Sequence, residues 1–130
     1  MEDNTLSVWV PMRKCYIVLT PEEWVRRHVV GYLTTTCGVE PTQICEEYPV
    51  KITSQAQRAD IVVMDRSGKP AILVECKAAN IPIDKEVFAQ AVRYNSVVGA
   101  RYVVLSNGLK HFCFEYSNGE YLPMNKFPQF

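Results

Sequence analysis

Residues 58–77 read RADIVVMDRSGKPAILVECK, and two apolar runs in this segment indicate how the chain folds. The runs 58–65 and 70–77 are rich in β-branched residues, and the Arg-Ser-Gly-Lys sequence between them is typical of a turn. Both runs are apolar on both faces in their middles, as strands are when other layers cover each side of a sheet. We therefore predict a β-hairpin buried inside the fold.

Charged side chains gather at one end of this hairpin. A turn centred on residues 67–68 makes Asp60 oppose Glu75 across the two strands. In the same register, Arg58 opposes Lys77. Directly opposed residues project to the same side of a sheet, whereas neighbours along a strand alternate between the two sides. The sequence therefore brings two carboxylates, a lysine and an arginine to one face.

This group of side chains suits metal-assisted hydrolysis of a phosphodiester. Cys76 is expected on the opposite face of the sheet and is not part of the group. Two carboxylates a few ångströms apart repel each other, and hard oxygen ligands of this kind favour Mg²⁺ or Mn²⁺ between them. A lysine beside the ion can polarise or deprotonate an attacking water. On residue types alone, the alternative is that Asp60, Glu75, Arg58 and Lys77 form two cross-strand ion pairs, which are common at strand ends.

A first helix is predicted over residues 21–36. Thr20, Pro21 and Glu23 match the N-cap, the first helical position and the glutamate of a capping box. Apolar residues then recur at helical spacing and predict a buried stripe of Val25, Val29, Tyr32 and Leu33. Glu22 precedes this stripe at helical intervals and extends it, so Glu22 is the candidate site residue and Glu23 the structural one.

A second helix is predicted from an Asp84 N-cap through Val98, with Gly99 as its stop. Its buried face is marked by Val87, Ala91, Tyr94 and Val98. Gln90 and Tyr94 are one turn apart beside this face, so both can point toward the sheet.

The remaining elements complete a single α/β domain. Residues 44–52 predict a weak strand, which Pro49 places at an edge of the sheet. Residues 101–105 and 111–116 predict two further strands around an Asn-Gly turn. We divide the chain into an N-terminal extension, a folded domain and an irregular C-terminal tail, residues 1–19, 20–116 and 117–130.

The composition excludes several classes of protein. Among 130 residues, 14 Lys and Arg balance 14 Asp and Glu, so any contact with nucleic acid must be local. The five cysteines include no CxxC pair, which favours a reduced, cytoplasmic setting. We expect no signal peptide, no membrane span of about 18 apolar residues and no glycine-rich nucleotide-binding loop.

Five segments of the sequence carry a recognisable pattern: TPEEWVR at 20–26, RAD at 58–60, VECK at 74–77, QAVRYN at 90–95 and LSNG at 105–108. Together, and in this order, they resemble the N-terminal nuclease domain of type I restriction enzyme restriction subunits. More broadly, they resemble the PD-(D/E)XK phosphodiesterase superfamily. The resemblance runs from about Thr20 to Tyr116 and implies a restriction-endonuclease-like αβββαβ core, a mixed sheet flanked by helices.

The resemblance also implies roles for the residues of the hairpin and the first helix. Asp60 and Glu75 would be metal-binding carboxylates, and Lys77 the catalytic lysine. Glu22 would be the acidic residue of the first helix that often completes such a site as a further metal ligand.

The second helix carries the next element of the resemblance. Gln90 and Tyr94 match the QxxxY element of the restriction-subunit and RecB-like branch, which lies beside the site, and Gln90 is counted with the catalytic residues. The residues expected to bind substrate are Arg58, Tyr94 and Arg26.

We therefore expect a Mg²⁺- or Mn²⁺-dependent DNA nuclease, or the nuclease module of a larger restriction or repair assembly. A catalytically silent nucleic-acid-binding or assembly module with the same fold is the alternative, and a metal-free binding domain with strand-end ion pairs is a third. Because the net charge is zero, affinity for DNA would come from a partner chain or a homodimer. Neither a membrane nor a nucleotide is an expected partner.

Overall fold

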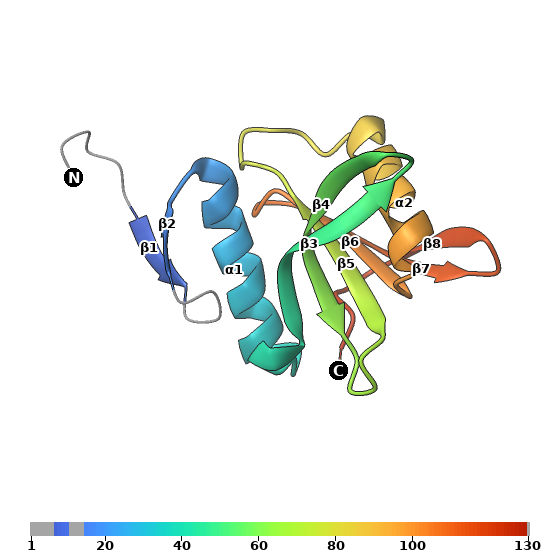
Figure 1. Cartoon of the computed structure of the whole chain (residues 1–130), viewed down its shortest axis with the longest axis horizontal. Helices are drawn as coiled ribbons and strands as arrows, with labels where there is room; N and C mark the ends of the chain where they lie inside the picture. The colour runs from blue at the N-terminus through green and yellow to red at the C-terminus, as the bar shows by residue number, and fades with distance from the viewer. Residues whose placement is uncertain (1–6, 11–14, 130) are drawn as a thin grey trace.

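The hairpin predicted over residues 58–77 supplies two interior strands of a six-stranded mixed sheet (Figure 1). The computed structural model describes residues 7–10 and 15–129. The strands of the sheet are β3 (Ile44–Ile52), β4 (Gln55–Met64), β5 (Pro70–Cys76), β6 (Tyr102–Ser106), β7 (His111–Ser117) and β8 (Glu120–Met124). They lie side by side in this order, and only β5 and β6 run parallel. The mixed α/β fold expected from the sequence is confirmed, with β3 at an edge.

Two helices cover opposite faces of this sheet, α1 (Pro21–Thr35) and α2 (Lys85–Val98) (Figure 1). The Thr20 side chain caps α1 by accepting from the main-chain N–H of Glu23 at 3.1 Å. Asp84 caps α2 in the same way, and Gly99 ends it with a φ of 75°, a left-handed conformation that suits glycine. Both helices therefore begin at the predicted caps.

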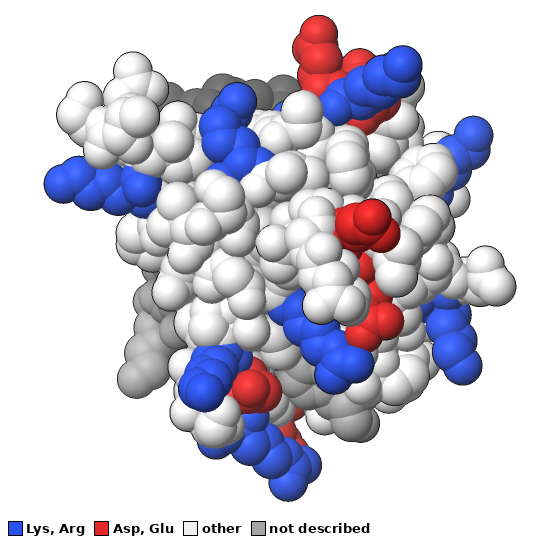
Figure 2. Space-filling view, turned by 90° about the vertical axis from the view of Figure 1, so that its right-hand side faces the viewer, with Lys and Arg blue, Asp and Glu red and all other residues white. Residues whose placement is uncertain are grey.

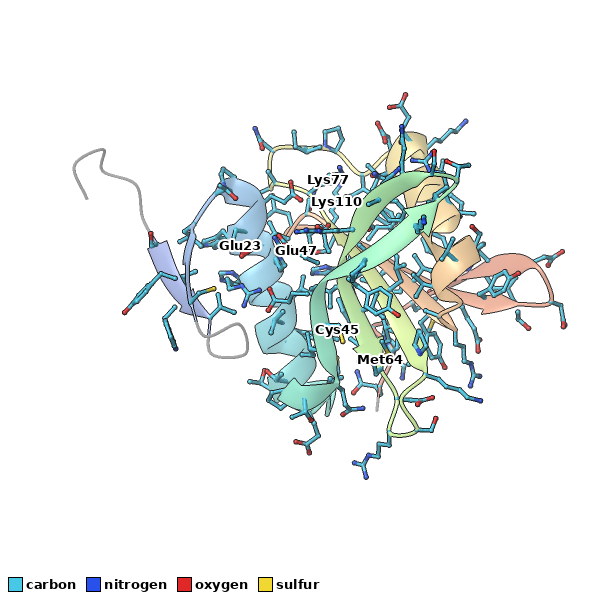
Figure 3. All side chains as sticks on the ribbon, in the orientation of Figure 1. Glu23, Cys45, Glu47, Met64, Lys77 and Lys110 are labelled. Carbon is cyan, nitrogen blue, oxygen red and sulfur yellow. The ribbon has the colours of Figure 1, made fainter. Side chains whose placement is uncertain are left out.

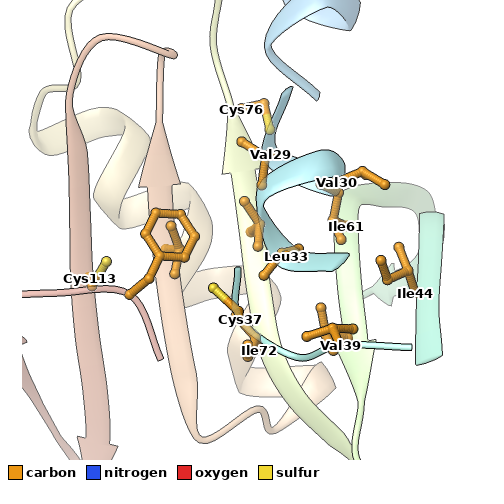
Figure 4. Packing of buried hydrophobic residues seen from close by; sticks show 14 of the residues in the cluster. Val29, Val30, Leu33, Cys37, Val39, Ile44, Ile61, Ile72, Cys76 and Cys113 are labelled. Atoms are coloured by element: carbon orange, nitrogen blue, oxygen red, sulfur yellow. The ribbon is translucent and has the colours of Figure 1, made fainter. Parts of the chain in front are cut away.

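Each helix buries its own apolar cluster against the sheet. The α1 cluster includes Val25, Val29, Val30, Leu33, Ile61, Val63, Ile72, Val74, Cys76 and Val104 (Figure 4). The α2 cluster includes Val50, Ala59, Val62, Leu73, Val87, Ala91, Tyr94, Val103 and Leu105. Burial of one such aliphatic side chain contributes about 1.5–3 kcal/mol, so these clusters hold the sheet between the helices.

Two sequence predictions about the domain are corrected. Residues 117–130, predicted to be an irregular tail, contain β8, which pairs with β7 around an Asn-Gly turn at 118–119. Asn118 and Gly119 have φ values of 51° and 80°, as such tight hairpin turns require. Tyr32, predicted to be buried, is 43% exposed and stacks edge-on against Phe127.

The N-terminal extension forms a small sheet of its own, β1 (Ser7–Val10) and β2 (Cys15–Val18). This pair lies beside α1, on the side away from the large sheet (Figure 1). Trp9 and Tyr16 pack edge to face across it with ring centroids 5.1 Å apart. No helix in the described ranges is both long enough and apolar enough to cross a membrane.

Candidate active site

The site begins where the pairing of β4 with β5 ends. The ladder pairs Ile61 with Val74, which is the register that the turn at 67–68 predicted. Beyond this pair, the main-chain N–H of Cys76 donates to Oδ2 of the Asp60 side chain at 2.7 Å, in place of a main-chain hydrogen bond between the two strands. The Asp60 carboxylate is thereby held beside the last residues of β5.

The half-buried Asp60 and the buried Glu75 form a carboxyl pair at this point. Glu75 is only 5% exposed, and its side chain hydrogen-bonds to that of Asp60. Burial, together with the neighbouring Asp60 carboxylate, raises the pKa of Glu75 to about 10. Glu75 Oε1 is buried and has no hydrogen-bond partner among the described residues. The pair therefore has one buried carboxyl oxygen, Glu75 Oε1, that could bind a ligand.

Lys77 lies next to this pair without bonding to it. Its main-chain N–H donates to the oxygen of Ser106 at 2.8 Å, and its positive charge offsets part of the upward shift in the Glu75 pKa. Among the ion pairs of the described residues, none joins Lys77 to Asp60 or Glu75. Cys76 packs in the α1 cluster, on the face opposite Glu75, as predicted.

The two adjacent glutamates of α1 have different surroundings. Glu22 is exposed overall. Partial desolvation of its carboxyl group and then the nearby Asp60 charge raise its pKa, and the charges of Lys77 and Arg26 offset part of this shift. Glu23 is 3% exposed, and its carboxylate accepts from Arg26 Nε at 2.6 Å. Glu22 thus lies at the rim of the site, but the prediction that it extends the buried stripe is wrong, because α1 turns Glu23 inward instead.

On α2, a chain of hydrogen bonds links the helix to the sheet. Gln90 Nε2 donates to the hydroxyl of Tyr94 at 2.9 Å, and that hydroxyl donates to Gln57 Oε1 at 2.8 Å. Burial, above all, raises the pKa of Tyr94, and the Glu75 and Asp60 charges add to this shift. Gln57 was missed because the predicted strand began one residue later, at Arg58. Its signal was a polar residue two positions before the buried Ala59.

Arg58 does not reach Lys77, and this prediction is wrong. Glu47 and Asp60 do not pair where β3 runs beside β4. On a regular strand, Ala59 and Ile61 would face the same side of the sheet, but Ala59 packs in the α2 cluster and Ile61 in the α1 cluster, so the alternation of faces is broken at Asp60. Arg58 consequently projects away from α2. Its side chain is 70% exposed and donates to Glu47 Oε2 at 3.3 Å.

Arg26 is also placed differently from the prediction of a substrate contact. Its side chain is 11% exposed and lies among Glu23, Glu47 and the main-chain oxygen of Asp60. Figure 3 shows the two labelled glutamates, on α1 and β3, near each other. Arg26 therefore contacts the backbone of Asp60 and is largely shielded from solvent.

A cavity of about 560 Å³ adjoins the site between α2 and the segment that connects β5 to it. Its lining includes Lys77, Gln90 and Arg93. Arg93 is exposed and, within the described part of the chain, has no ion-pair partner. Lys77 and Lys110 lie at the same end of the sheet (Figure 3). Asp84 and Glu86 also line the cavity, so its charged lining is of mixed sign, and Lys77 supplies the positive charge next to the carboxyl pair.

The carboxyl pair fits a magnesium-type ion with water completing its coordination. No group of three or more His, Cys, Asp or Glu side chains is gathered for a metal ion within residues 7–10 and 15–129, so Glu22 does not complete a carboxylate triad there. Mg²⁺, however, is commonly bound by one or two carboxylates together with waters and phosphate oxygens. Asp60 and Glu75, with the unpartnered Glu75 Oε1, match that donor set.

Positive charge is not concentrated on the side of α2 and the β7–β8 hairpin. Figure 2 shows this face, where uncharged side chains cover most of the described surface and basic and acidic ones are scattered. This distribution agrees with the zero net charge of the chain. That any nucleic-acid contact is local stays a prediction from the composition.

The solved structures that resemble this chain include two with related descriptions. A fragment described as an HsdR subunit of a type I restriction enzyme from Vibrio vulnificus YJ016 is 25% identical, with a TM-score of 0.64, over 85% of this chain and 24% of that chain. A protein described as a nuclease belonging to DUF820 from Anabaena variabilis ATCC 29413 is 11% identical, with a TM-score of 0.53, over 94% of this chain and 78% of that chain, and shares the fold. The chain thus spans about a quarter of the Vibrio fragment.

No curated protein matches the chain. Residues 21–128 match the family described as "Type I restriction enzyme R protein N terminus (HSDR_N)". This range covers α1, α2 and the entire six-stranded sheet, including β8. The resemblance inferred from the five sequence segments is confirmed, and the chain belongs to the family of type I restriction enzyme R protein N termini.

Proposed function

We propose that this chain is a Mg²⁺- or Mn²⁺-dependent DNA nuclease domain of the PD-(D/E)XK type. Its place would be a restriction-type assembly, in line with the family to which it belongs. The observation that carries the proposal is the hydrogen-bonded pair of the half-buried Asp60 and the buried Glu75, beside which Glu75 Oε1 and the Lys77 ammonium have no partner among the described residues. A purely structural ion-pair cluster would join these groups to one another, and the described residues do not do so.

Asp60 and Glu75 would hold the ion, and Glu22 would act from the rim of the site. A bound Mg²⁺ would supply Lewis acidity toward a non-bridging phosphate oxygen. Glu75 would release its proton to solvent when the ion binds, because a metal-binding carboxyl group must be deprotonated. Lys77 would then lie beside two ionised carboxylates.

Lys77 would hydrogen-bond the attacking water and favour its deprotonated form. The ammonium can point toward a reacting water, because no carboxylate of the described residues holds it. Gln90 is held by Tyr94, which in turn is held by Gln57, so its amide has a fixed direction at the edge of the cavity. Gln90 and Arg93 would bind the DNA strand there.

The proposal is tested by incubating the whole chain with supercoiled, linear, single-stranded and branched DNA in Mg²⁺ or Mn²⁺. Lys77→Ala is the test variant, and Lys69→Ala, in the exposed turn at the opposite end of the hairpin, is the matched control. We expect cleavage by the wild type and by Lys69→Ala, and none by Lys77→Ala.

Metal binding provides a second measurement on the same proteins. Because Lys77 is not a ligand, Lys77→Ala should keep the thermal stabilisation by Mn²⁺ that the wild type shows. Full activity of Lys77→Ala would contradict the assigned role of the lysine. A wild type that cleaves none of the four DNA forms would favour the silent-module alternative.

A further inference from the structure

Arg26 on α1 connects three parts of the molecule through the three nitrogens of its guanidinium group. Nε donates to Glu23 Oε2 at 2.6 Å, and Nη1 donates to the main-chain oxygen of Asp60 at 3.5 Å. Nη2 lies 3.7 Å from Glu47 Oε1 on β3. The side chain thus bridges a buried carboxylate of the helix, the edge strand and the residue that carries the site carboxylate.

Asp60 needs this support because the sheet does not supply it. The register of β3 with β4 skips Glu47 and Asp60, and Glu47 has a φ of 52°, in the left-handed region. An irregularity of this kind bends a strand and redirects a side chain, and such features are frequent next to active sites. The backbone of Asp60 is therefore less restrained by its neighbouring strands than the residues that follow it in β4.

An arginine is specifically suited to this place. Its planar group presents donors in fixed directions, whereas lysine offers one compact charge at the end of a flexible stem. A lysine at position 26 could still neutralise the buried Glu23, but it could not also reach the Asp60 oxygen and Glu47. The charge-assisted contact with Glu23 fixes the guanidinium, and the other two nitrogens then act on β4 and β3.

We propose that Arg26 is a positioning residue, which holds the Asp60 peptide so that the Asp60 carboxylate stays on the Cys76 N–H and against Glu75. Its consequence for catalysis rests on the proposed nuclease function, but the positioning itself does not. Arg26 would act on metal binding and cleavage only through Asp60, without touching the substrate.

The test compares Arg26→Lys with Arg27→Lys. Arg27 is a matched control, since it is a similarly buried arginine one position along that approaches Glu23 and pairs with Glu46. Amide hydrogen exchange is measured at Cys76, whose N–H donates to Asp60, and at Val74, which lies in the ladder of the same strand. The Mn²⁺-dependent shift in melting temperature and the cleavage of DNA are measured on the same proteins.

In Arg26→Lys, we expect exchange at Cys76 to accelerate at least tenfold more than exchange at Val74, and the apparent Kd for Mn²⁺ to rise at least tenfold. Arg27→Lys should change both amides by the same factor and leave the Kd within about twofold of the wild type. Glu23→Gln keeps an acceptor for Nε but weakens the anchor, so it should give the same selective change to a smaller degree, and it serves if Arg26→Lys does not fold.

Equal acceleration of the two amides in Arg26→Lys and Glu23→Gln would overturn the inference, because Arg26 would then support only global stability. A wild type without Mn²⁺ stabilisation or cleavage would instead overturn the proposed function. The Cys76 measurement would still decide whether Arg26 positions Asp60.

Discussion

Asp60 Oδ2 accepts a hydrogen bond from the main-chain N–H of Cys76 at 2.7 Å, so a side chain continues the contact between two strands where their ladder stops. The same Asp60 carboxyl group also hydrogen-bonds to the side chain of Glu75. The same contact that closes the end of the hairpin therefore creates the carboxyl pair of the site.

The Glu75 pKa makes the stability of the metal-free protein depend on pH. The carboxyl has a pKa of about 10 in the folded protein against an ordinary value of 4.5, so between these values the unfolded chain binds fewer protons than the folded one. The free energy of unfolding should therefore fall as pH rises, by up to about 1.4 kcal/mol per pH unit from this group. Glu75→Gln should remove that slope. Urea denaturation in EDTA at several pH values between 5.5 and 8.5 measures it, and an unchanged slope in the variant would exclude Glu75 as its source.

Asp60→Asn separates a metal site from a structural cluster. The asparagine oxygen can still accept from the Cys76 N–H, and loss of the Asp60 charge removes one of the causes that raise the Glu75 pKa, so the metal-free variant should be about as stable as the wild type, or slightly more. At a metal concentration of about 100 Kd, the wild type should gain about 2.7 kcal/mol, and the variant should lose most of that gain. Thermal melts with EDTA, Mg²⁺ and Mn²⁺ measure both quantities. A variant that is clearly destabilised in EDTA, beside a wild type indifferent to metal, would point to a structural cluster.

Glu22 and Glu23 are adjacent, but their replacement should affect the stability of the protein differently. Glu23→Ala leaves Arg26 without its closest buried partner, and we expect a loss of on the order of 3 kcal/mol in the free energy of unfolding. Glu22→Ala should leave stability unchanged, because Glu22 is exposed, and should reduce cleavage. Urea denaturation and cleavage of the best DNA substrate measure the two effects. A stable Glu23→Ala and an unfolded Glu22→Ala would show that the phase of α1 is shifted.

Arg93 should contact a DNA phosphate in the cavity beside Lys77. Arg93→Ala should weaken binding uniformly across DNA sequences and reduce the slope of log affinity against log salt by about 1. Arg66→Ala is the control, since Arg66 is an exposed arginine in the turn at the other end of the hairpin. Fluorescence anisotropy at several salt concentrations, in Ca²⁺ to prevent cleavage, measures the slope. Equal effects of the two substitutions would indicate only a general loss of charge.

The local elements of this protein could be predicted from the sequence because their signals lie within a few residues. Thr20 and Asp84 cap the helices through neighbouring N–H groups, and Gly99 ends α2 through its own backbone conformation. From Ile61 to Val63, β4 pairs with β5 in the register that the turn predicted, although the register shifts by one residue between Val63 and Met64. Since register determines which side chains share a face, the closeness of Asp60 and Glu75 followed from the sequence as well.

Longer-range features required the folded structure. The change of phase at Asp60 depends on how β3 pairs with β4, and no turn signal near Asp60 reports it, so strict alternation placed Arg58 on the wrong face. The position of the Arg26 side chain on α1 depends on Glu47, which lies on the edge strand β3. Gln57 became part of the site because Tyr94 of α2 packs over it. Helical and strand periodicity describe one element at a time, whereas these positions are decided by packing between elements that are distant in the chain.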